Sequence, residues 1–313
     1  MTTYNGQRYI SETMRSLLAQ TYKDFEFIIV DDGSSDATAE IVNSFKDSRI
    51  KLIVNKRNLG ISGAANAGLG FCNGKYIVRH DQDDISLPQR IEREVAFMEA
   101  NPKIGVCGTW YKEFGERKKT KRNVANPESL AVKLLRGCYI QQPTAIIRKS
   151  VLDKFSIRYR ENLAVANDYC MWLDMLGRCK FANIPEVLFK YRIHKTQTGK
   201  RYKSVVRKEY AFSRKQFFGR YENSLTDAEI EMFSYNLIDG DLPAPEQARA
   251  EYDKLGEIAV KIIGFNRLNK IWDETELVKF LRKMWRKLCI KNAFGSIGYF
   301  RLKKILETKL KEL

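Results

Sequence analysis

Apolar and polar positions follow two alternating patterns over the first 110 residues. In the segment 7–20, apolar residues recur at helical spacing, which predicts an amphipathic helix. Continuous apolar runs predict buried strands at 25–30, 50–54, 76–78 and 104–111. The stretches between them predict helices over 34–45, 60–71 and 87–100. Strands and helices that alternate in this way predict an α/β fold, with a Rossmann-like, mostly parallel sheet flanked by helices.

The pattern changes after residue 111. Residues 112–126 are polar and basic, which predicts a loop. The following segment predicts a further helix, a strand at 144–148 and a helix over 169–177. Beyond residue 200 the pattern is helical and basic. We therefore expect one domain over 1–200 and a helical, basic region over 201–313.

The chain opens on a turn-like segment, Thr2 to Gly6, that leads into the first helix. No apolar strand precedes this helix, although a βαβ arrangement needs one there. We expect either that Met1 ends a truncated first strand or that the assigned start lies too far downstream. The alternative is a fold that manages without the strand. Further along, Ser34 or Ser35 is expected to cap the helix that ends near residue 45.

Composition excludes several classes of protein. The chain has 313 residues, of which 44% are hydrophobic, and this is enough apolar material for a core. Its six cysteines include no CxxC pair, which excludes a zinc ribbon and a thioredoxin-type motif, and scattered cysteines suit a reducing cytosol. The sequence contains neither a run of about 20 apolar residues nor a signal-peptide pattern. These features predict a cytoplasmic protein.

The net charge of +17 is unevenly distributed, because the first 100 residues carry an acidic excess and the rest is basic. Three carboxylates, Asp81, Asp83 and Asp84, follow the predicted strand at 76–78. They repel one another at neutral pH, and a divalent cation such as Mg²⁺ or Mn²⁺ relieves that repulsion. The alternative is a solvated turn with an Asp helix cap. Beside them, His80 is a candidate ion-pair partner.

A second acidic cluster, 31–36, also follows a strand, and a carboxylate there can accept hydrogen bonds from a nucleobase or a ribose. The alternative is an ordinary Asp-Gly turn. Residues 58–68 are small enough for close backbone approach to a ligand or to a neighbouring element. Asp168 stands at a predicted helix start, where the helix should lower its pKa, and the alternative role is an N-cap.

Taken in order, these segments resemble the inverting family-two glycosyltransferases with the GT-A fold. The resemblance covers about residues 1–200 and rests on six ordered motifs, which are MTTYNGQRYI, QTYKDFE, VDDGSSD, the small-residue segment 58–68, DQDD at 81–84, and NDY with YRIH at 167–194. Two features depart from the family. The apolar strand ahead of the threonine is absent, and Asn167 stands where the family commonly has Glu.

The resemblance implies a metal-dependent, inverting transfer of a sugar from a nucleotide-sugar donor, with a lean to UDP, onto a glycan or lipid-linked acceptor. The implied cofactor is Mn²⁺ or Mg²⁺, held at Asp83 and Asp84, and the implied catalytic base is Asp168. The implied nucleotide-binding residues are Thr2, Tyr4, Asp32 and Asp81. Arg192 and His194 are the implied contacts to the pyrophosphate or the acceptor.

The basic carboxyl-terminal region contains an amphipathic pattern over 277–288, with Trp285 among its apolar residues and a second basic-aromatic patch at 299–306. Such a helix can lie on an anionic membrane surface, so we expect a peripheral position on the inner face of the membrane. The alternative is a helix packed on the catalytic domain. A nucleic-acid-binding module is disfavoured because acidic strand ends repel phosphate. The remaining alternatives are an inactive family member and a metal-dependent nucleotidyltransferase.

Overall fold

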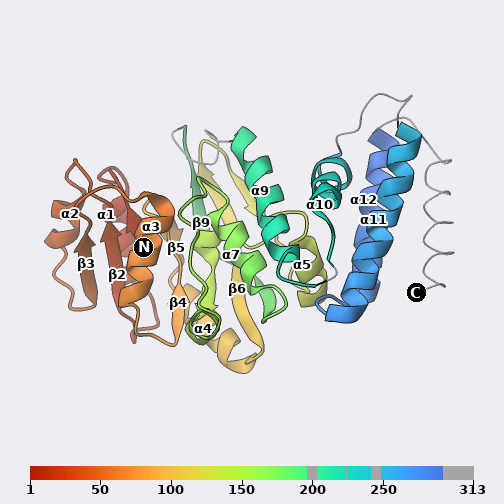
Figure 1. Ribbon diagram of the computed structural model, residues 1–313. Helices are drawn as coiled ribbons and strands as arrows, with labels where there is room; N and C mark the ends of the chain where they lie inside the picture. The colour runs from red at the N-terminus through yellow and green to blue at the C-terminus, as the bar shows by residue number, and fades with distance from the viewer. Residues whose placement is uncertain (196–202, 223, 241–247, 292–313) are drawn as a thin grey trace. The chain divides into compact units, whose positions relative to one another are not determined.

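The structure is a computed structural model that describes residues 1–195, 203–222, 224–240 and 248–291 (Figure 1). The chain forms two compact units. Unit 1 comprises Met1–Leu130 with Cys138–Val206, and unit 2 comprises Ala131–Gly137 with Arg207–Leu313. None of the described helices combines the length and the apolar character that a bilayer crossing requires.

The first sheet of unit 1 is entirely parallel. Its strand order is β1 (Thr2–Thr3), β2 (Phe27–Asp31) and β3 (Ile50–Val54). Every residue of β2 is buried, because helices cover both faces. The helices α1 (Ile10–Leu18) and α2 (Thr38–Ser44) pack against Phe27 and Ile29, while α3 (Gly60–Phe71) packs against Ile28 and Val30. The continuous apolar run at this strand reflects that two-sided burial.

The second sheet of unit 1 is mixed. Its order is β4 (Tyr76–Val78), β8 (Ile146–Arg148), β6 (Ile104–Gly115), β9 (Lys180–Ile193) and β5 (Ile85–Ser86), with β7 (Lys119–Lys121) on the outer part of β6. The long pair β6 and β9 is parallel, whereas β4 with β8 and β5 with β9 are antiparallel. The α/β class was predicted, and the pairing within this sheet is more varied than the alternation of elements indicated.

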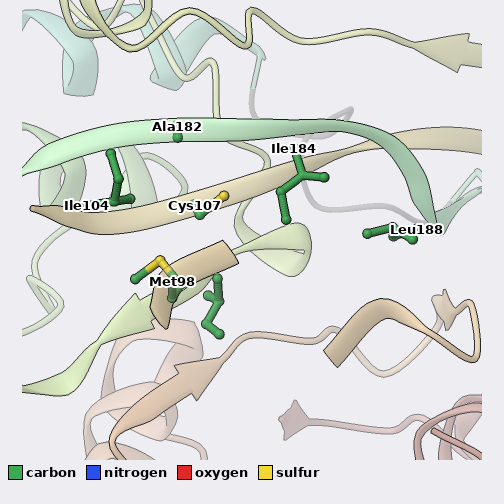
Figure 2. Packing of buried hydrophobic residues seen from close by; sticks show 7 residues of the cluster. Met98, Ile104, Cys107, Ala182, Ile184 and Leu188 are labelled. Atoms are coloured by element: carbon green, nitrogen blue, oxygen red, sulfur yellow. The ribbon is translucent and has the colours of Figure 1, made fainter. Parts of the chain in front are cut away.

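A hydrophobic cluster joins helix α4 (Arg90–Ala100) to the long parallel pair of strands (Figure 2). Met98 of α4 and Ile104 and Cys107 of β6 belong to this cluster, together with Ile146 of β8 and Ala182, Ile184 and Leu188 of β9. Met98 and Cys107 are fully buried. The cluster therefore fixes the position of β9, which leads to the candidate site at its carboxyl end.

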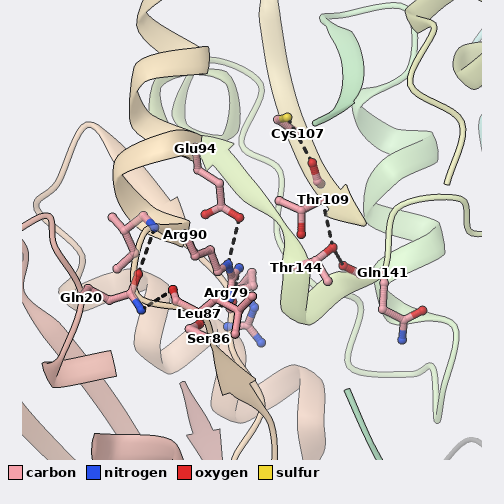
Figure 3. A network of polar contacts seen from close by, with 12 residues as sticks. Gln20, Arg79, Ser86, Leu87, Arg90, Glu94, Cys107, Thr109, Gln141 and Thr144 are labelled. Carbon is pink, nitrogen blue, oxygen red and sulfur yellow. Dashed lines mark hydrogen bonds and ion pairs between the residues drawn. The ribbon is translucent and has the colours of Figure 1, made fainter. Parts of the chain in front are cut away.

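A buried polar network holds the segment that connects β4 to α4 (Figure 3). Arg90 donates to Glu94 Oε1 at 2.9 Å, to Ser86 Oγ at 3.1 Å and to the carbonyl of Arg79 at 3.0 Å. The side chains of Arg90 and Glu94 are both fully buried. Because Arg79 and Ser86 flank the acidic residues 81–84, this network fixes both ends of the acidic turn.

Several elements of unit 1 differ from expectation. Strand β9 was not predicted because Pro185 interrupts its pattern; the structure accommodates Pro185 and Glu186 at an irregularity, where Thr109 pairs with Ile184 and Trp110 with Val187. The expected loop at 112–126 instead extends β6 and adds β7, a short charged edge strand. The strand expected to be truncated is represented by β1.

The connection that leads into α2 corrects one capping prediction, and the second capping candidate, Asp168, lies in α7 (Asn167–Met175). Helix α2 begins at Thr38, whose backbone N–H donates to Asp36 at 3.0 Å, so neither Ser34 nor Ser35 caps it.

The remaining short elements of unit 1 are η1 (Gln142–Thr144) and α6 (Lys149–Lys154), and α5 (Pro127–Lys133) crosses from unit 1 into unit 2.

Unit 2 is helical in the part that the structure describes. Most of α9 (Lys203–Phe218) lies in it, followed by α10 (Asp227–Met232), the π-helical turn η2 (Phe233–Ile238), α11 (Ala248–Asn269) and α12 (Glu274–Lys291). Thr226 and Glu229 form a capping box at α10. The buried Arg214 side chain of α9 donates to the carbonyls of Leu135 and Arg136, which ties the segment 131–137 to this unit.

The apolar face of α12 packs inside unit 2. Leu277, Leu281 and Trp285 are 0%, 0% and 2% exposed, and the Trp285 ring lies 5.5 Å from that of Tyr252 in α11. This face is therefore part of the unit's own core. The second patch expected at 299–306 lies outside the described residues.

Candidate active site

The acidic turn between β4 and β5 places three carboxylates close together. Asp84 is fully buried, and its Oδ1 atom accepts a hydrogen bond from the backbone N–H of Arg192 at 2.7 Å. Burial, followed by repulsion from Asp83 and Asp81, raises the pKa of Asp84 well above its ordinary value. Burial and repulsion from Asp83 likewise raise the pKa of Asp81 to about 6. The carboxyl groups of this turn therefore oppose one another's ionisation.

His80 does not serve as the ion-pair partner expected of it. Its ring is 2% exposed and packs edge-on against Phe189, and Nδ1 lies 2.7 Å from the carbonyl oxygen of Asp81. Burial lowers its pKa well below the ordinary value, and Arg90 acts in the same direction. A buried imidazole that resists protonation cannot balance the carboxylates beside it.

Gln82 joins the acidic turn to the beginning of the chain. Its Oε1 atom accepts from the Thr3 hydroxyl at 2.6 Å and from the Tyr4 N–H at 2.9 Å, while Nε2 donates to the Tyr4 carbonyl at 3.2 Å. Thr13 of α1 adds a hydroxyl 2.9 Å from the carbonyl oxygens of both Gln82 and Asp84. Gln82 was not assigned a role from sequence, although it lies within the acidic motif.

The second acidic cluster lies at the carboxyl end of β2. Asp32 is 3% exposed and accepts hydrogen bonds from Asn55 Nδ2 at 2.7 Å and from the Leu59 N–H at 2.9 Å. Ser34 bonds to the Asp31 carboxylate and accepts from the Asn5 N–H at 2.9 Å. Asp32 is therefore fixed between the ends of two strands and the start of α3, at the sheet edge where ligands bind in α/β proteins.

The two remaining candidates for nucleotide binding differ in their surroundings. Tyr4 is 46% exposed, so its ring is available to a ligand. Thr2 lies in β1, paired with Val30, and no side-chain contact places it at the site. Tyr4 contacts the acidic turn through Gln82. Thr2 lies two positions earlier in the chain, within the first sheet.

Strand β9 leads two further candidates, Arg192 and His194, to the acidic turn. Arg192 Nε donates to the carbonyl of Asp83 at 2.6 Å, and its guanidinium lies 4.4 Å from the ring centres of Tyr9 and Phe114. His194 Nε2 lies 2.7 Å from Asp83 Oδ2. These residues line a cavity of about 500 Å³ together with Arg8, Tyr9 and Lys195. A basic cavity beside carboxylates is suited to a phosphorylated ligand.

Asp168 stands at the start of α7, and its carboxylate is held at both oxygens. Oδ1 accepts from the Tyr169 N–H at 2.6 Å, and Oδ2 accepts from the Cys138 thiol at 3.3 Å. The N-cap position is Ala166, so the alternative role as an N-cap is wrong. Burial raises the pKa of Asp168, contrary to the decrease expected from the helix, because removal from water outweighs the hydrogen bonds.

Asp168 also influences the acidic turn electrostatically. Its charge contributes to the raised pKa of Asp81, so the two carboxylates lie within electrostatic range although they come from distant segments. Most of the candidate residues are thereby linked. Asp83, Asp84, Arg192 and His194 share one set of contacts, and Asp168 lies within electrostatic range of Asp81 in the same turn. Asp32 is connected to this turn through Thr3, whose carbonyl accepts from the Asp32 N–H at 2.9 Å and whose hydroxyl donates to Gln82.

The side chains near the acidic turn limit how a metal ion could be coordinated. In the described ranges, no group of three or more His, Cys, Asp or Glu side chains is arranged to hold an ion by itself. The buried Asp84 Oδ2 atom nevertheless has no hydrogen-bond partner, and the neighbouring carboxylates are hard oxygen donors. The residues therefore fit a divalent cation that takes one or two carboxylates and completes its coordination with substrate phosphates.

Comparison with known proteins gives a consistent result. The model of the family described as "Glycosyl transferase family 2" matches residues 1–156. A Haemophilus influenzae protein described as an uncharacterized glycosyltransferase is 35% identical over 212 residues, 64% of this chain and 66% of that protein. An Escherichia coli protein, the UDP-Glc:alpha-D-GlcNAc-diphosphoundecaprenol beta-1,3-glucosyltransferase WfaP, is 33% identical over 208 residues, 65% of this chain and 80% of that protein.

Solved structures share the fold at lower identity. The Staphylococcus aureus TarS fragment 1–349 in complex with UDP-GlcNAc superimposes with a TM-score of 0.65 and 17% identity, covering 99% of this chain and 90% of that one. The Pyrobaculum calidifontis mannosyltransferase PcManGT, in complex with GDP-Man and Mn²⁺, gives a TM-score of 0.55 at 15% identity, covering 99% and 85%. At such identities the likeness concerns the fold.

Proposed function

The chain belongs to glycosyl transferase family 2 and is a glycosyltransferase, and from this premise we propose that it transfers a sugar from a UDP-linked donor to a hydroxyl of a glycan or lipid-linked acceptor, with inversion. The observation that carries the proposal is the set of contacts that brings Arg192 and His194 against Asp83 and Asp84, beside a cavity lined by basic residues. We assign the catalytic domain to residues 1–200 and an accessory role to 201–313.

The donor nucleotide is assigned to Tyr4, Asp32, Asp81 and Thr2. An exposed tyrosine ring supplies a surface for a base, and a fixed carboxylate such as Asp32 can accept from a base or ribose donor. The preference for a UDP-linked donor is supported by the TarS complex with UDP-GlcNAc and by the UDP-Glc donor in the name of the E. coli relative. Arg192 and His194 line the basic cavity and are assigned to the pyrophosphate or the acceptor.

We assign the cation, Mn²⁺ or Mg²⁺, to Asp83 and Asp84. When bound, a divalent ion stabilises the negative charge that develops on a diphosphate leaving group. The protein's own contribution is to hold the two carboxylates rigidly. Arg192 fixes Asp84 through its backbone N–H, and His194 contacts Asp83.

Asp168 is assigned as the general base. Its ionised carboxylate accepts the proton of the acceptor hydroxyl as that oxygen forms a bond to the anomeric carbon. On the opposite face the bond from the anomeric carbon to the phosphate oxygen breaks, and the nucleoside diphosphate leaves with the electron pair. One displacement inverts the anomeric centre, so the reaction requires no covalent sugar–enzyme intermediate and no nucleophilic Ser or Cys. Holding both substrates in register supplies much of the rate enhancement.

We further propose a peripheral position on the inner face of the membrane, reached through charge. Lys133, Arg136, Lys283 and Lys287 of unit 2 form a cationic cluster. Lys283 lowers the pKa of Lys133, after burial, and Arg136 lowers the pKa of Lys287. Cations this close to one another attract anionic headgroups, and the packed apolar face of α12 leaves charge as the means of attachment. The acceptor of the E. coli relative, a diphosphoundecaprenol-linked sugar by name, agrees with such a location.

A transfer assay tests the proposed function. Purified protein is incubated with Mn²⁺, a radiolabelled UDP-sugar and a synthetic polyprenyl-diphosphate-linked sugar, and the product is analysed by NMR for anomeric configuration. We expect transfer with inversion from at least one UDP-sugar. Retention of configuration would overturn the assignment of Asp168. The absence of both transfer and donor hydrolysis with UDP-, dTDP- and GDP-sugars would favour an inactive family member. Release of diphosphate with nucleotide transfer would favour a nucleotidyltransferase.

A further inference from the structure

Cys138 lies directly against the proposed base. Its Sγ atom is 3.3 Å from Asp168 Oδ2, and 2.9 Å from the carbonyl oxygen of Ile140. The two residues come from different segments of unit 1, because Cys138 precedes η1 and Asp168 begins α7. In the described part of the chain, Cys138 is the one side chain that donates a hydrogen bond to this carboxylate.

We infer that Cys138 is a positioning residue for Asp168: its thiol orients the carboxylate and favours the ionised form that accepts the proton. This inference rests on the proposed function, in which Asp168 is the base. Tyr169 N–H holds the opposite oxygen, Oδ1, so the two donors together fix the plane of the carboxylate. When the plane of the carboxylate is fixed, its remaining lone pairs point in a defined direction. An in-line displacement requires such an orientation, because the base must accept the proton of the attacking hydroxyl.

The thiol has one hydrogen and two acceptors within reach. When Asp168 is ionised, the hydrogen is drawn to the carboxylate, because a charged acceptor forms the stronger bond. When Asp168 has taken the acceptor's proton, the thiol can turn to the Ile140 carbonyl, which Trp172 Nε1 also contacts at 3.2 Å. No proton passes to or from sulfur. The rotation lets the same side chain accommodate both states of the base.

The surroundings keep Cys138 in the form that can donate. Burial raises the pKa of the thiol well above its ordinary value, and the neighbouring Asp168 charge raises it further. At neutral pH the residue is therefore a donor and not a thiolate nucleophile. The other titratable groups that face Asp168 are Asp81 and Tyr159, since Asp168 raises the pKa of both. Neither forms a hydrogen bond to the Asp168 carboxylate.

The pH dependence of kcat/KM tests this role. Cys138→Val removes the donor with little change in volume, and Cys138→Ala serves if the valine variant folds poorly. We expect the acidic limb of the profile to move upward by roughly 0.5–1 pH unit, because the ionised carboxylate loses a hydrogen bond. Cys138→Ser retains a donor, and its limb should lie nearer to that of the wild type. UDP binding, followed by thermal shift, should be the same in all variants.

Cys107→Ala is the matched control. Cys107 is a fully buried thiol, whereas Cys138 is partly buried, and the Cys107 Sγ contacts the Gly108 carbonyl at 3.3 Å rather than an ionisable group. The acidic limb of the kcat/KM profile of Cys107→Ala should not move. If Cys138→Val and Cys107→Ala give the same limb while Asp168→Asn is inactive, the role of Cys138 is wrong and the proposed function stands. If Asp168→Asn retains wild-type turnover, the proposed base and the role of Cys138 both fail.

Discussion

His194 Nε2 lies 2.7 Å from Asp83 Oδ2, although 111 positions separate the two residues in the chain. The contact depends on strand β9, whose pairing with β5 carries its final residues to the acidic turn. Both side chains are mostly buried, at 19% and 18% exposure, so the pair is partly shielded from water. The histidine thereby orients a carboxylate that we assign to the cation.

We expect His194→Ala to reduce kcat/KM by about 10–100-fold, the usual loss when a residue that orients a metal ligand is removed. The concentration of Mn²⁺ needed for half-maximal activity should rise with it. A metal titration of steady-state rates measures both effects. Glu186→Ala changes an exposed residue of the same strand and should leave both values unchanged. Equal behaviour of the two variants would remove His194 from this role.

Asp168→Asn should lower kcat by about 10²–10⁴-fold, the contribution of a positioned general base, while UDP-sugar affinity stays within about twofold. The amide retains the size of the side chain and cannot accept the proton. Single-turnover transfer and isothermal titration with the UDP-sugar separate these quantities. Asp174→Asn on the same helix, where Asp174 pairs with Arg160, is the control and should remain active. Wild-type turnover in Asp168→Asn would contradict the assignment.

The sequence predicted those elements whose patterns are uninterrupted. The boundaries of β3, α3 and β4 match the expected ranges. In these segments the pattern of residues is uninterrupted and indicates one type of secondary structure. Strand β9 escaped prediction because Pro185 interrupts its pattern, and a proline argues against the interior of a strand. The capping of α2 escaped because Asp31 engages the Ser34 hydroxyl.

The candidate site was predictable as a set of residues but not as a set of contacts. Motif order indicated Asp81, Asp83 and Asp168, whereas the Asp83–His194 contact depends on strand pairings that no local pattern encodes. Cys138 belonged to no motif, and only the packing of its loop on α7 brings it to Asp168. The direction of the Asp168 pKa shift was wrong because the helix position is visible in the sequence and the burial is not.

Transfer should cease when divalent cations are chelated and should resume when Mn²⁺ or Mg²⁺ is added back. Asp84→Asn should require a higher metal concentration, because the substitution removes a buried carboxylate oxygen that has no hydrogen-bond partner in the protein. A rate measurement in EDTA followed by metal titration tests both points. Asp153→Asn, an exposed acid of unit 1, is the control. Full activity in EDTA would discard the assignment of the cation to Asp83 and Asp84.

Removal of one partner of the buried Arg90–Glu94 pair should be strongly destabilising. Glu94→Ala leaves the Arg90 charge without its carboxylate in the core and should lower the free energy of unfolding by about 3–5 kcal/mol. Glu99→Ala breaks a pair at the surface, with Lys75 at 2.7 Å, and should change stability little. Urea denaturation of both variants measures the contrast, and similar midpoints would contradict it.

The same pair predicts a pH dependence of stability. Burial raises the pKa of Glu94 from 4.5 in the unfolded chain to about 7 in the folded protein, against the opposing effect of Arg90. The folded state therefore holds this proton more tightly, and the contribution of Glu94 to stability declines as the pH rises from about 4.5 to 7. Glu94→Gln removes the titration, so the difference in unfolding free energy from the wild type should change across that interval and stay constant above it.

Membrane attachment through charge makes a different prediction from attachment through an inserted helix. Lys283→Glu with Lys287→Glu reverses two exposed members of the cationic cluster and should weaken binding to phosphatidylglycerol vesicles severalfold per charge, without lowering stability. Higher salt should weaken the wild type in the same direction. Lys46→Glu with Lys56→Glu makes the same charge change on exposed positions of unit 1 and is the control. Vesicle co-sedimentation at two salt concentrations distinguishes the cases: equal loss in both double variants would indicate a response to net charge alone, and binding that resists salt would contradict an electrostatic attachment.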